Sequence, residues 1–229
     1  GHAPENTLSS FAKALELGAP WVELDVYVVE SQLIVFHDDR LERTSNGHGL
    51  LQESSFAYLR SLDAGQGERI PTLDEVFALI NRRAGINIEL KGAGTAEPVA
   101  NLLARQRGAG WPDSLIMVSS FDHEQLRELR HRDSRVRIGV LYDECPTDGL
   151  RVATELAAYA ANFSQRIATS DCVAQAHAKG LRVLVYTVNE LDELRALRDL
   201  GVDGVFTNFP ERVLKLNAET VGAMGAGLL

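Results

Sequence analysis

Hydrophobic and polar positions divide the chain into two kinds of segment. Short apolar runs rich in Val, Ile and Leu are typical of buried strands. Longer amphipathic segments follow most of these runs and favour helices packed against a sheet. This alternation predicts a parallel sheet built from strand–helix units. The strands are predicted at 21–29, 86–91, 115–119, 137–142, 159–163, 182–188 and 203–207, and the helices at 5–17, 72–84, 96–108, 122–133, 148–157, 170–179, 190–200 and 210–217.

The number of units predicts the architecture. Seven predicted strands are each followed by a helix, and the helix at 5–17 has no strand before it. We therefore expect a first strand that precedes Gly1 and is missing from the printed sequence. Adding that strand gives eight units, which predicts an α/β fold of the (β/α)8 TIM-barrel type. Because no linker-like segment divides the chain, we expect residues 1–229 to form a single domain.

The link after the first predicted strand is unusually short. Only Glu30, Ser31 and Gln32 separate the run 21–29 from a second apolar run at 33–36. Parallel strands need a crossover of about a dozen residues or more. Residues 26–36 are therefore predicted to form an antiparallel hairpin that stands above the barrel mouth.

A polar segment, residues 39–70, follows the hairpin and the pair His37-Asp38. Long polar loops of this kind commonly form a lid or a wall over a substrate. We interpret the segment as an insertion into the barrel.

Acidic side chains interrupt two of the apolar strands. Glu23 and Asp25 are two residues apart, so they lie on one face of their strand, and Glu89 and Lys91 share a face in the same way. Buried carboxylates are costly unless they are paired, hydrogen-bonded or bound to a metal. Because barrel active sites lie at the carboxyl ends of the strands, these residues predict a divalent metal site for an anionic substrate. Carboxylate ligands favour Mg²⁺, Ca²⁺ or Mn²⁺.

Structural roles are the alternative for each of these residues. A salt bridge inside the barrel mouth would also account for Glu23 and Asp25, and a simple ion pair would account for Glu89 and Lys91. The chain has few lysines that could neutralise the acids. They are Lys13, Lys91, Lys179 and Lys215.

Three further side chains are candidates for the same mouth. The return leg of the hairpin delivers His37 to the level of the carboxylates, which favours proton transfer over the alternative of a histidine that only holds a loop. Phe121 and Tyr186 lie at strand ends and are candidates for contact with substrate, or are aromatic residues of the core.

Composition excludes several classes of partner. The formal net charge of −9 argues against nucleic acid or an anionic membrane surface as the main partner. No apolar run is long enough for a transmembrane helix. The two cysteines, Cys145 and Cys172, do not suggest a disulfide framework. We expect a cytoplasmic protein whose partner is a small molecule.

Several short motifs occur in the order found in one family. With these motifs the chain resembles the bacterial-type glycerophosphodiester phosphodiesterases, and the resemblance covers nearly the whole chain. The motifs are Pro4-Glu5-Asn6-Thr7, Glu23-Leu24-Asp25-Val26, His37-Asp38-Asp39, Leu41-Glu42-Arg43-Thr44-Ser45-Asn46-Gly47, Glu89-Leu90-Lys91, Ser119-Ser120-Phe121, Tyr186-Thr187-Val188-Asn189 and Gly201-Val202-Asp203-Gly204-Val205-Phe206-Thr207-Asn208.

The resemblance implies roles for individual residues. It implies that Glu23, Asp25 and Glu89 bind the divalent metal ion. It also implies that His37 is one of two catalytic histidines, with the second expected upstream of Gly1. Lys91 then corresponds to a lysine of the phosphate or metal site that contacts substrate. Phe121 and Tyr186 correspond to residues that bind substrate, and Tyr186 stands where the family often has Trp.

The reaction implied by the resemblance is metal-dependent hydrolysis of glycerophosphodiesters. Its products would be glycerol 3-phosphate and an alcohol, formed through a cyclic phosphate, which would place the protein in lipid and glycerol metabolism. Two alternatives remain open from the sequence. One is a lysophospholipase D-like or phosphoinositide-type phosphodiesterase on the same fold, and the other is a barrel that binds phosphodiesters without cleaving them.

Overall fold

An eight-stranded sheet forms the centre of the molecule. The computed structural model describes residues 1–146 and 148–225. The strand order is β2-β1-β3-β4-β5-β6-β7-β8. All neighbouring pairs are parallel except β1 and β2. The strands are β1 (Trp21–Val29), β2 (Gln32–Val35), β3 (Gly85–Leu90), β4 (Ile116–Ser120), β5 (Arg137–Tyr142), β6 (Ala160–Ser164), β7 (Arg182–Tyr186) and β8 (Gly204–Val205).

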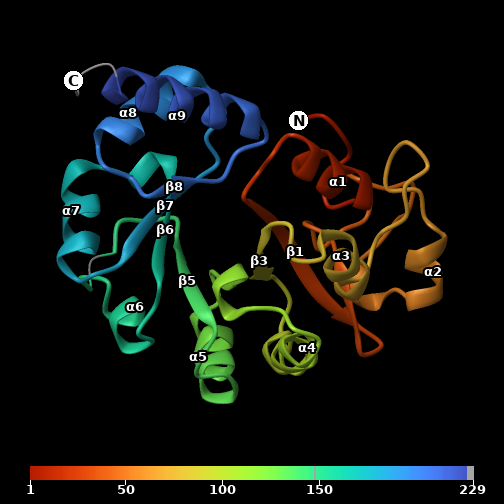
Figure 1. Cartoon of the computed structure of the whole chain (residues 1–229). Helices are drawn as coiled ribbons and strands as arrows, with labels where there is room; N and C mark the ends of the chain where they lie inside the picture. The colour runs from red at the N-terminus through yellow and green to blue at the C-terminus, as the bar shows by residue number, and fades with distance from the viewer. Residues whose placement is uncertain (147, 226–229) are drawn as a thin grey trace.

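Helices cover the outer face of the curled sheet (Figure 1), whose edge strands are β2 and β8. This arrangement confirms the predicted class, a parallel TIM-type sheet wrapped by helices. Within the described residues no strand joins β8 to β1, so the curled sheet is a half-barrel there. The helices are α1 (Leu8–Glu16), α2 (Phe56–Ser61), α3 (Leu73–Ile80), α4 (Ala96–Gly108), α5 (His123–Arg132), α6 (Arg151–Glu155), α7 (Ser170–Ala178), α8 (Leu191–Asp199) and α9 (Pro210–Gly225), with short 3₁₀ turns η1 (Leu51–Glu53), η2 (Asp113–Leu115) and η3 (Gln165–Ile167).

Strand alternation separates the core from the site. Val22, Leu24 and Val26 of β1 are buried in the main hydrophobic cluster, together with the corresponding residues of β3. Because successive side chains of a strand point to opposite faces, Glu23 and Asp25 face away from this cluster. The apolar face packs against the helices, and the acidic face is left for the concave side of the sheet.

The predicted hairpin is confirmed. β1 and β2 pair antiparallel from Val26 opposite Val35 to Val29 opposite Gln32. Glu30 and Ser31 both have positive φ values, 48° and 65°, as expected for a two-residue turn that matches the twist of the flanking strands. The hairpin returns the chain to the level of Asp25, whose carbonyl accepts from the Phe36 N–H at 3.0 Å, and His37 follows directly.

The insertion is more ordered than its polar sequence predicts. It contains η1 and α2, and it packs on the hairpin through a second hydrophobic cluster. The sequence pattern missed this cluster because its apolar residues are not periodic, and they become neighbours only after the segment folds back. The cluster consists of Tyr27, Val29, Ile34, Phe36, Leu41, Leu51, Leu59, Leu62, Ala64 and Ile70.

The helix predicted at 5–17 begins later, at Leu8. Thr7 is its N-cap and accepts a hydrogen bond from the Ser10 backbone N–H at 3.3 Å. The Thr7 hydroxyl also donates to the Pro4 carbonyl at 2.7 Å, and Asn6 adopts a left-handed conformation with φ of 55°. The hydroxyl therefore fixes residues 4–6 as a loop that enters the concave face.

Replacing Thr7 tests this anchor. Thr7 is fully buried, and Thr7→Ala removes both the cap and the bond to Pro4. We expect the free energy of unfolding to fall by about 1–3 kcal/mol, measured by urea denaturation. Thr7→Ser keeps the hydroxyl and should lose less than half as much. Equal losses in the two variants would contradict a role for the hydroxyl.

Candidate active site

Three carboxylates meet towards the carboxyl end of the parallel pairing between β1 and β3, which runs from Trp21 opposite Gly85 to Val26 opposite Leu90. Asp25 and Glu89 are direct partners in the parallel register, so their side chains emerge side by side on one face. Glu23 precedes Asp25 by one pleat on the same face. One carboxylate oxygen from each of the three residues lies within 4.8 Å of the others. The three acids that the sequence placed on shared strand faces therefore converge, and their binding of a metal ion stays a prediction.

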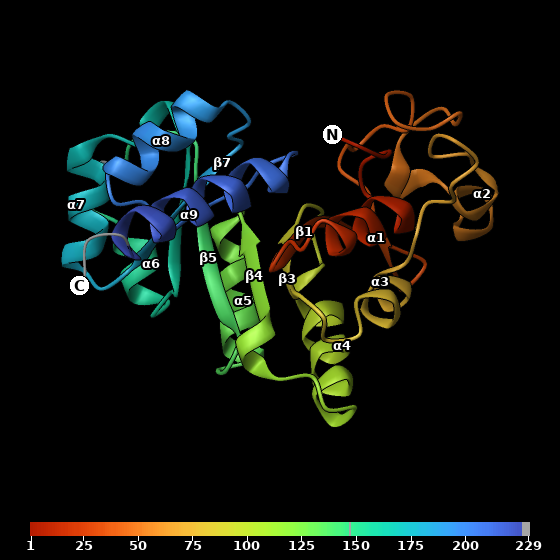
Figure 2. The same cartoon turned by 45° about the horizontal axis from the view of Figure 1, so that its top comes forward.

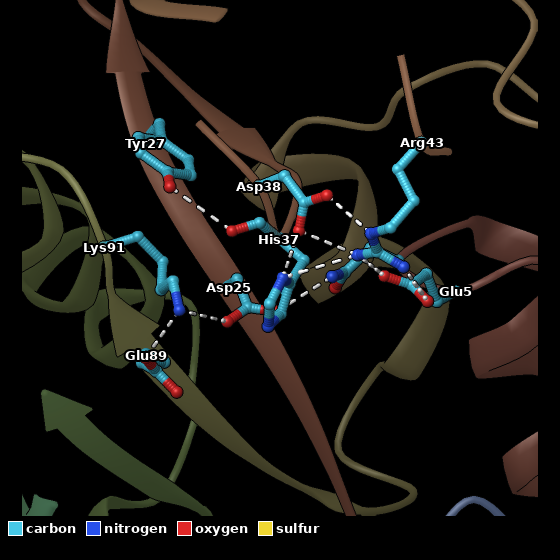
Figure 3. Close-up of polar contacts among 9 residues, drawn as sticks. Glu5, Asp25, Tyr27, His37, Asp38, Arg43, Glu89 and Lys91 are labelled. Carbon is cyan, nitrogen blue, oxygen red and sulfur yellow. Dashed lines mark hydrogen bonds and ion pairs between the residues drawn. The ribbon is translucent and has the colours of Figure 1, made fainter. Parts of the chain in front are cut away.

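Lys91 and Asn6 are the immediate polar neighbours of the carboxylates. The Lys91 ammonium Nζ lies 3.1 Å from Glu89 Oε1 and 3.8 Å from Asp25 Oδ1 (Figure 3). Asn6 Nδ2 donates to Asp25 Oδ2 at 2.9 Å. Asp25 is buried and Glu89 half-buried, whereas Glu23 is open to solvent on the concave side.

The charge of the cluster is not balanced. Although part of the Glu23 side chain is exposed, its carboxylate loses hydration among the neighbouring groups, which raises its pKa well above its usual range, and repulsion from Asp25 and Glu89 adds to this effect. Burial likewise raises the pKa of Glu89 and that of Asp25, although Lys91 opposes the rise in both. An ion pair with one lysine therefore leaves excess negative charge. Three converging carboxylate oxygens form a donor set that suits a hard divalent cation.

His37 lies beside this cluster and is held by Asp38. The His37 ring approaches Asp25 (Figure 3), and its Nδ1 lies 2.5 Å from Asp38 Oδ1. Hydrogen bonds from Arg43 lower the pKa of Asp38 to about 2. Because Asp38 is ionised and can only accept, Nδ1 carries the proton of this contact. Nε2 is then the ring nitrogen left to exchange a proton with a substrate.

Arg43 connects the histidine to the loop before α1. Its guanidinium donates to Asp38 Oδ2 at 2.5 Å and to Glu5 Oε1 at 2.6 Å (Figure 3). The Tyr27 hydroxyl adds a hydrogen bond to the His37 carbonyl at 3.3 Å. His37 is thus positioned by the insertion, the hairpin and the N-terminal loop together.

The sequence analysis included Glu5, Asn6, Asp38 and Arg43 in its motifs but did not predict that they support the site. Glu5 and Asn6 belong to one motif, Asp38 to a second and Arg43 to a third. The tertiary contacts between motifs, rather than any spacing within one, define their roles. The adjacency of Asp38 to a candidate catalytic histidine was the signal that could have revealed the pairing.

The two candidate aromatic residues contact each other. The rings of Phe121 and Tyr186 meet edge to face with centroids 5.9 Å apart. Phe121 is exposed, which excludes a core role for it. The Tyr186 hydroxyl donates to the Tyr142 carbonyl at 2.9 Å. Burial raises the pKa of Tyr186, and the negative charges of Asp143 and Glu89 raise it further.

The ion pair between Asp38 and Arg43 predicts a pH-dependent stability. Because folding lowers the Asp38 pKa from 3.8 to about 2, its contribution is complete above about pH 4 and is lost as the pH falls towards 2. At pH 7 we expect Asp38→Asn to lower the free energy of unfolding by about 1–2 kcal/mol. Urea denaturation at pH 7, 4 and 3 should show this difference shrinking as the pH falls. A difference that is constant or grows would contradict the assignment.

Comparison with known proteins identifies the family. Residues 1–212 match the model of the glycerophosphoryl diester phosphodiesterase family. A glycerophosphodiester phosphodiesterase of Caldanaerobacter subterraneus is 31% identical, with 94% of this chain and 93% of the relative covered. A Bacillus altitudinis protein of the same description is 32% identical, with 96% and 95% covered.

Solved structures agree with these sequence relatives. A phosphodiesterase of Oleispira antarctica, solved in complex with its product sn-glycerol-3-phosphate, superposes with a TM-score of 0.87 at 31% identity, covering 94% of this chain and 92% of the other. A glycerophosphodiester phosphodiesterase described for Galdieria sulphuraria gives 0.83 at 28% identity, covering 94% and 92%. No helix in the described ranges has the length and apolar character needed to cross a bilayer. The chain belongs to the glycerophosphoryl diester phosphodiesterase family.

Proposed function

We propose that this enzyme hydrolyses glycerophosphodiesters to glycerol 3-phosphate and an alcohol with the help of one divalent cation. The convergence of Glu23, Asp25 and Glu89 within 4.8 Å carries the proposal, because their charge is only partly neutralised by Lys91. A bound Mg²⁺, Ca²⁺ or Mn²⁺ would polarise the phosphoryl oxygens and lower the pKa of a nearby hydroxyl. The product found in the Oleispira antarctica relative supports the same substrate class here.

His37 is the proposed proton-transfer residue. Asp38 accepts from Nδ1 and Arg43 fixes Asp38, so Nε2 is the atom that exchanges a proton with the substrate. The imidazolium that forms when Nε2 takes a proton is stabilised by the neighbouring carboxylate. Asp38 and Arg43 act through His37 and are positioning residues.

Lys91, Phe121 and Tyr186 are the proposed substrate-binding residues. The Lys91 ammonium projects into the acidic cluster, where it would offset charge that develops on a phosphate. Phe121 and Tyr186 form an aromatic edge with one exposed ring, which suits the apolar faces of a glycerol or head-group chain. The fixed Tyr186 hydroxyl indicates that this residue would contribute its ring rather than a hydrogen bond to the substrate.

We propose that the reaction proceeds through a cyclic phosphate. The 2-hydroxyl of the glycerol attacks phosphorus within the same molecule, which saves the entropy of bringing two reactants together. One group removes the proton of this hydroxyl, another protonates the leaving alcohol, and water then opens the ring. His37 performs one of the two transfers. His2 does not fit the other, because it pairs with Glu211 at 3.0 Å and packs against Phe209.

We further propose that residues 1–229 act as one domain. The hydrophobic cluster of the insertion includes Tyr27 and Val29 of β1, so the insertion shares a strand with the barrel core. A cytoplasmic location, expected from the sequence, stays a prediction that cell fractionation would test.

Replacing a carboxylate tests the cation site. In wild-type protein with chelator removed, a divalent cation at about 100 times its dissociation constant should stabilise the fold by about 2–3 kcal/mol and raise Tm by about 5–10 °C. Glu89→Gln should lose this shift and the release of glycerol 3-phosphate. In chelator its Tm should equal or exceed that of wild type, because one repelling charge is gone. Glu53→Gln, an exposed acid of η1, should behave as wild type. A cation-dependent shift that survives in Glu89→Gln would contradict the site.

Replacing His37 tests its role in proton transfer. His37→Ala should lower turnover of glycerophosphocholine by about 100- to 10 000-fold, with little change in KM. If His37 protonates the leaving alcohol, a nitrophenyl ester of glycerol phosphate should recover most of the loss, because its leaving group needs no proton. Absence of recovery would assign His37 to the 2-hydroxyl. His131→Ala on α5 is the matched control, and near-normal turnover in His37→Ala would contradict both roles.

A panel of head groups distinguishes the related activities. Glycerol 3-phosphate release from glycerophosphocholine and glycerophosphoethanolamine is expected. Preferred cleavage of lysophospholipids or phosphoinositides over both compounds would favour the related alternative instead.

A further inference from the structure

The two cysteines of the chain lie next to each other in the fold, although they are far apart in the sequence. Cys145 follows β5, and Cys172 lies in the first turn of α7. Their sulfur atoms are 3.1 Å apart although 27 positions separate the residues, and both are free thiols. The sequence did not suggest a disulfide framework, because only the fold brings the pair together.

Independent contacts hold the two segments in place. The Arg166 guanidinium in η3 donates to the Asp143 carbonyl at 2.8 Å, which ties the segment before α7 to the segment after β5. The Thr169 hydroxyl caps α7 by accepting from the Cys172 backbone N–H at 3.3 Å. The proximity of the sulfurs is therefore part of a wider contact between two loops at the carboxyl ends of β5 and β6.

The two thiols differ in access. Cys145 is exposed, so a dissolved oxidant can reach it. Cys172 is 6% exposed and packs in the main hydrophobic cluster, so its sulfur is shielded from solvent and held in place. An exposed thiol beside a buried one favours attack on the oxidant by the exposed thiol and resolution of the mixed disulfide by the buried one.

We propose that Cys145 and Cys172 form a reversible intramolecular disulfide when the enzyme meets a small disulfide oxidant such as glutathione disulfide. A disulfide bond is about 2.05 Å long, so the sulfurs must approach by about 1 Å. Rotation of the exposed Cys145 side chain in its loop provides this movement while Cys172 stays within α7.

The exchange balances in two steps. The Cys145 thiolate attacks one sulfur of glutathione disulfide, which forms a mixed disulfide and releases one glutathione thiolate. The Cys172 thiolate then attacks the Cys145 sulfur, which forms the internal disulfide and releases the second glutathione. The protein loses two electrons and two protons, and both are recovered in two molecules of reduced glutathione.

The contact between the thiols also affects the rate. The hydrogen bond with Cys172 raises the pKa of the Cys145 thiol, which lowers the thiolate fraction at neutral pH. Because the thiolate is the nucleophile, oxidation should accelerate as the pH rises from 7 to 9.

The bond would link the loop after β5 to the first turn of α7. The Tyr142 carbonyl, which accepts from the Tyr186 hydroxyl, lies three positions before Cys145. Cross-linking residues 145 and 172 would close a loop of the unfolded chain and reduce its entropy, which stabilises the folded state. Oxidised protein should therefore unfold at a higher temperature than reduced protein.

The test compares reduced protein with protein treated with glutathione disulfide. Native intact-mass analysis should show loss of two hydrogens per chain, and peptide mapping without reductant should find Cys145 joined to Cys172. The oxidised form should unfold at a Tm about 5–10 °C higher, and dithiothreitol should reverse both changes. Non-reducing gels should show monomeric chains.

Single variants supply the controls. Cys145→Ser replaces an exposed thiol and should abolish both the internal bond and the Tm shift. Cys172→Ala should stop at the mixed disulfide on Cys145, seen as the mass of one added glutathione. Wild-type protein that carries a stable glutathione adduct, forms disulfide-linked dimers, or keeps both thiols titratable would overturn the proposal. A Tm shift that persists in Cys145→Ser would overturn the stabilisation by this bond.

Discussion

Repulsion among three carboxylates is the constraint on which the rest of the site depends. Glu23, Asp25 and Glu89 gather on one face because β1 and β3 pair in parallel with Asp25 opposite Glu89. Such a cluster is costly in the absence of counter-charge, and Lys91 provides only one positive charge. The unfavourable repulsion is concentrated at the mouth of the half-barrel. We propose that a divalent cation supplies the missing positive charge there. The apolar faces of the same strands supply the core that holds the acids in place.

Several elements of the fold position the residues around this cluster. The buried cap at Thr7 shapes the loop from which Asn6 reaches Asp25 and Glu5 reaches Arg43. Arg43 belongs to the insertion, which packs on the hairpin through its own hydrophobic cluster. The hairpin returns the chain to His37. Changes in the insertion or the N-terminal loop should therefore reach the histidine without touching substrate (Figure 2 shows these elements on one side of the molecule).

Local sequence patterns predicted the strands and the shared face of the acidic residues. They did not predict contacts between segments that are distant in the sequence. Alternation along β1 and β3 reveals which side chains share a face, so the cluster of Glu23, Asp25 and Glu89 could be predicted. The short link after β1 also forced the hairpin. The link between Arg43 and Glu5 spans 38 positions, and no periodicity signals it. The same is true of the sulfurs of Cys145 and Cys172. The predicted helix ends were wrong where backbone conformation determines them. Helix α6 is shorter than the predicted 148–157 because Leu150 and Ala157, on either side of it, have positive φ values.

Anomalous X-ray scattering from Mn²⁺ in crystals of this enzyme tests the central claim most directly. The account predicts one strong peak on the concave side of the sheet, within about 2.0–2.6 Å of an oxygen from each of Glu23, Asp25 and Glu89. The Lys91 ammonium should then lie beside the ion and not between the carboxylates. The absence of a peak between the three carboxylates at saturating Mn²⁺, or a single peak bound elsewhere, would contradict the account.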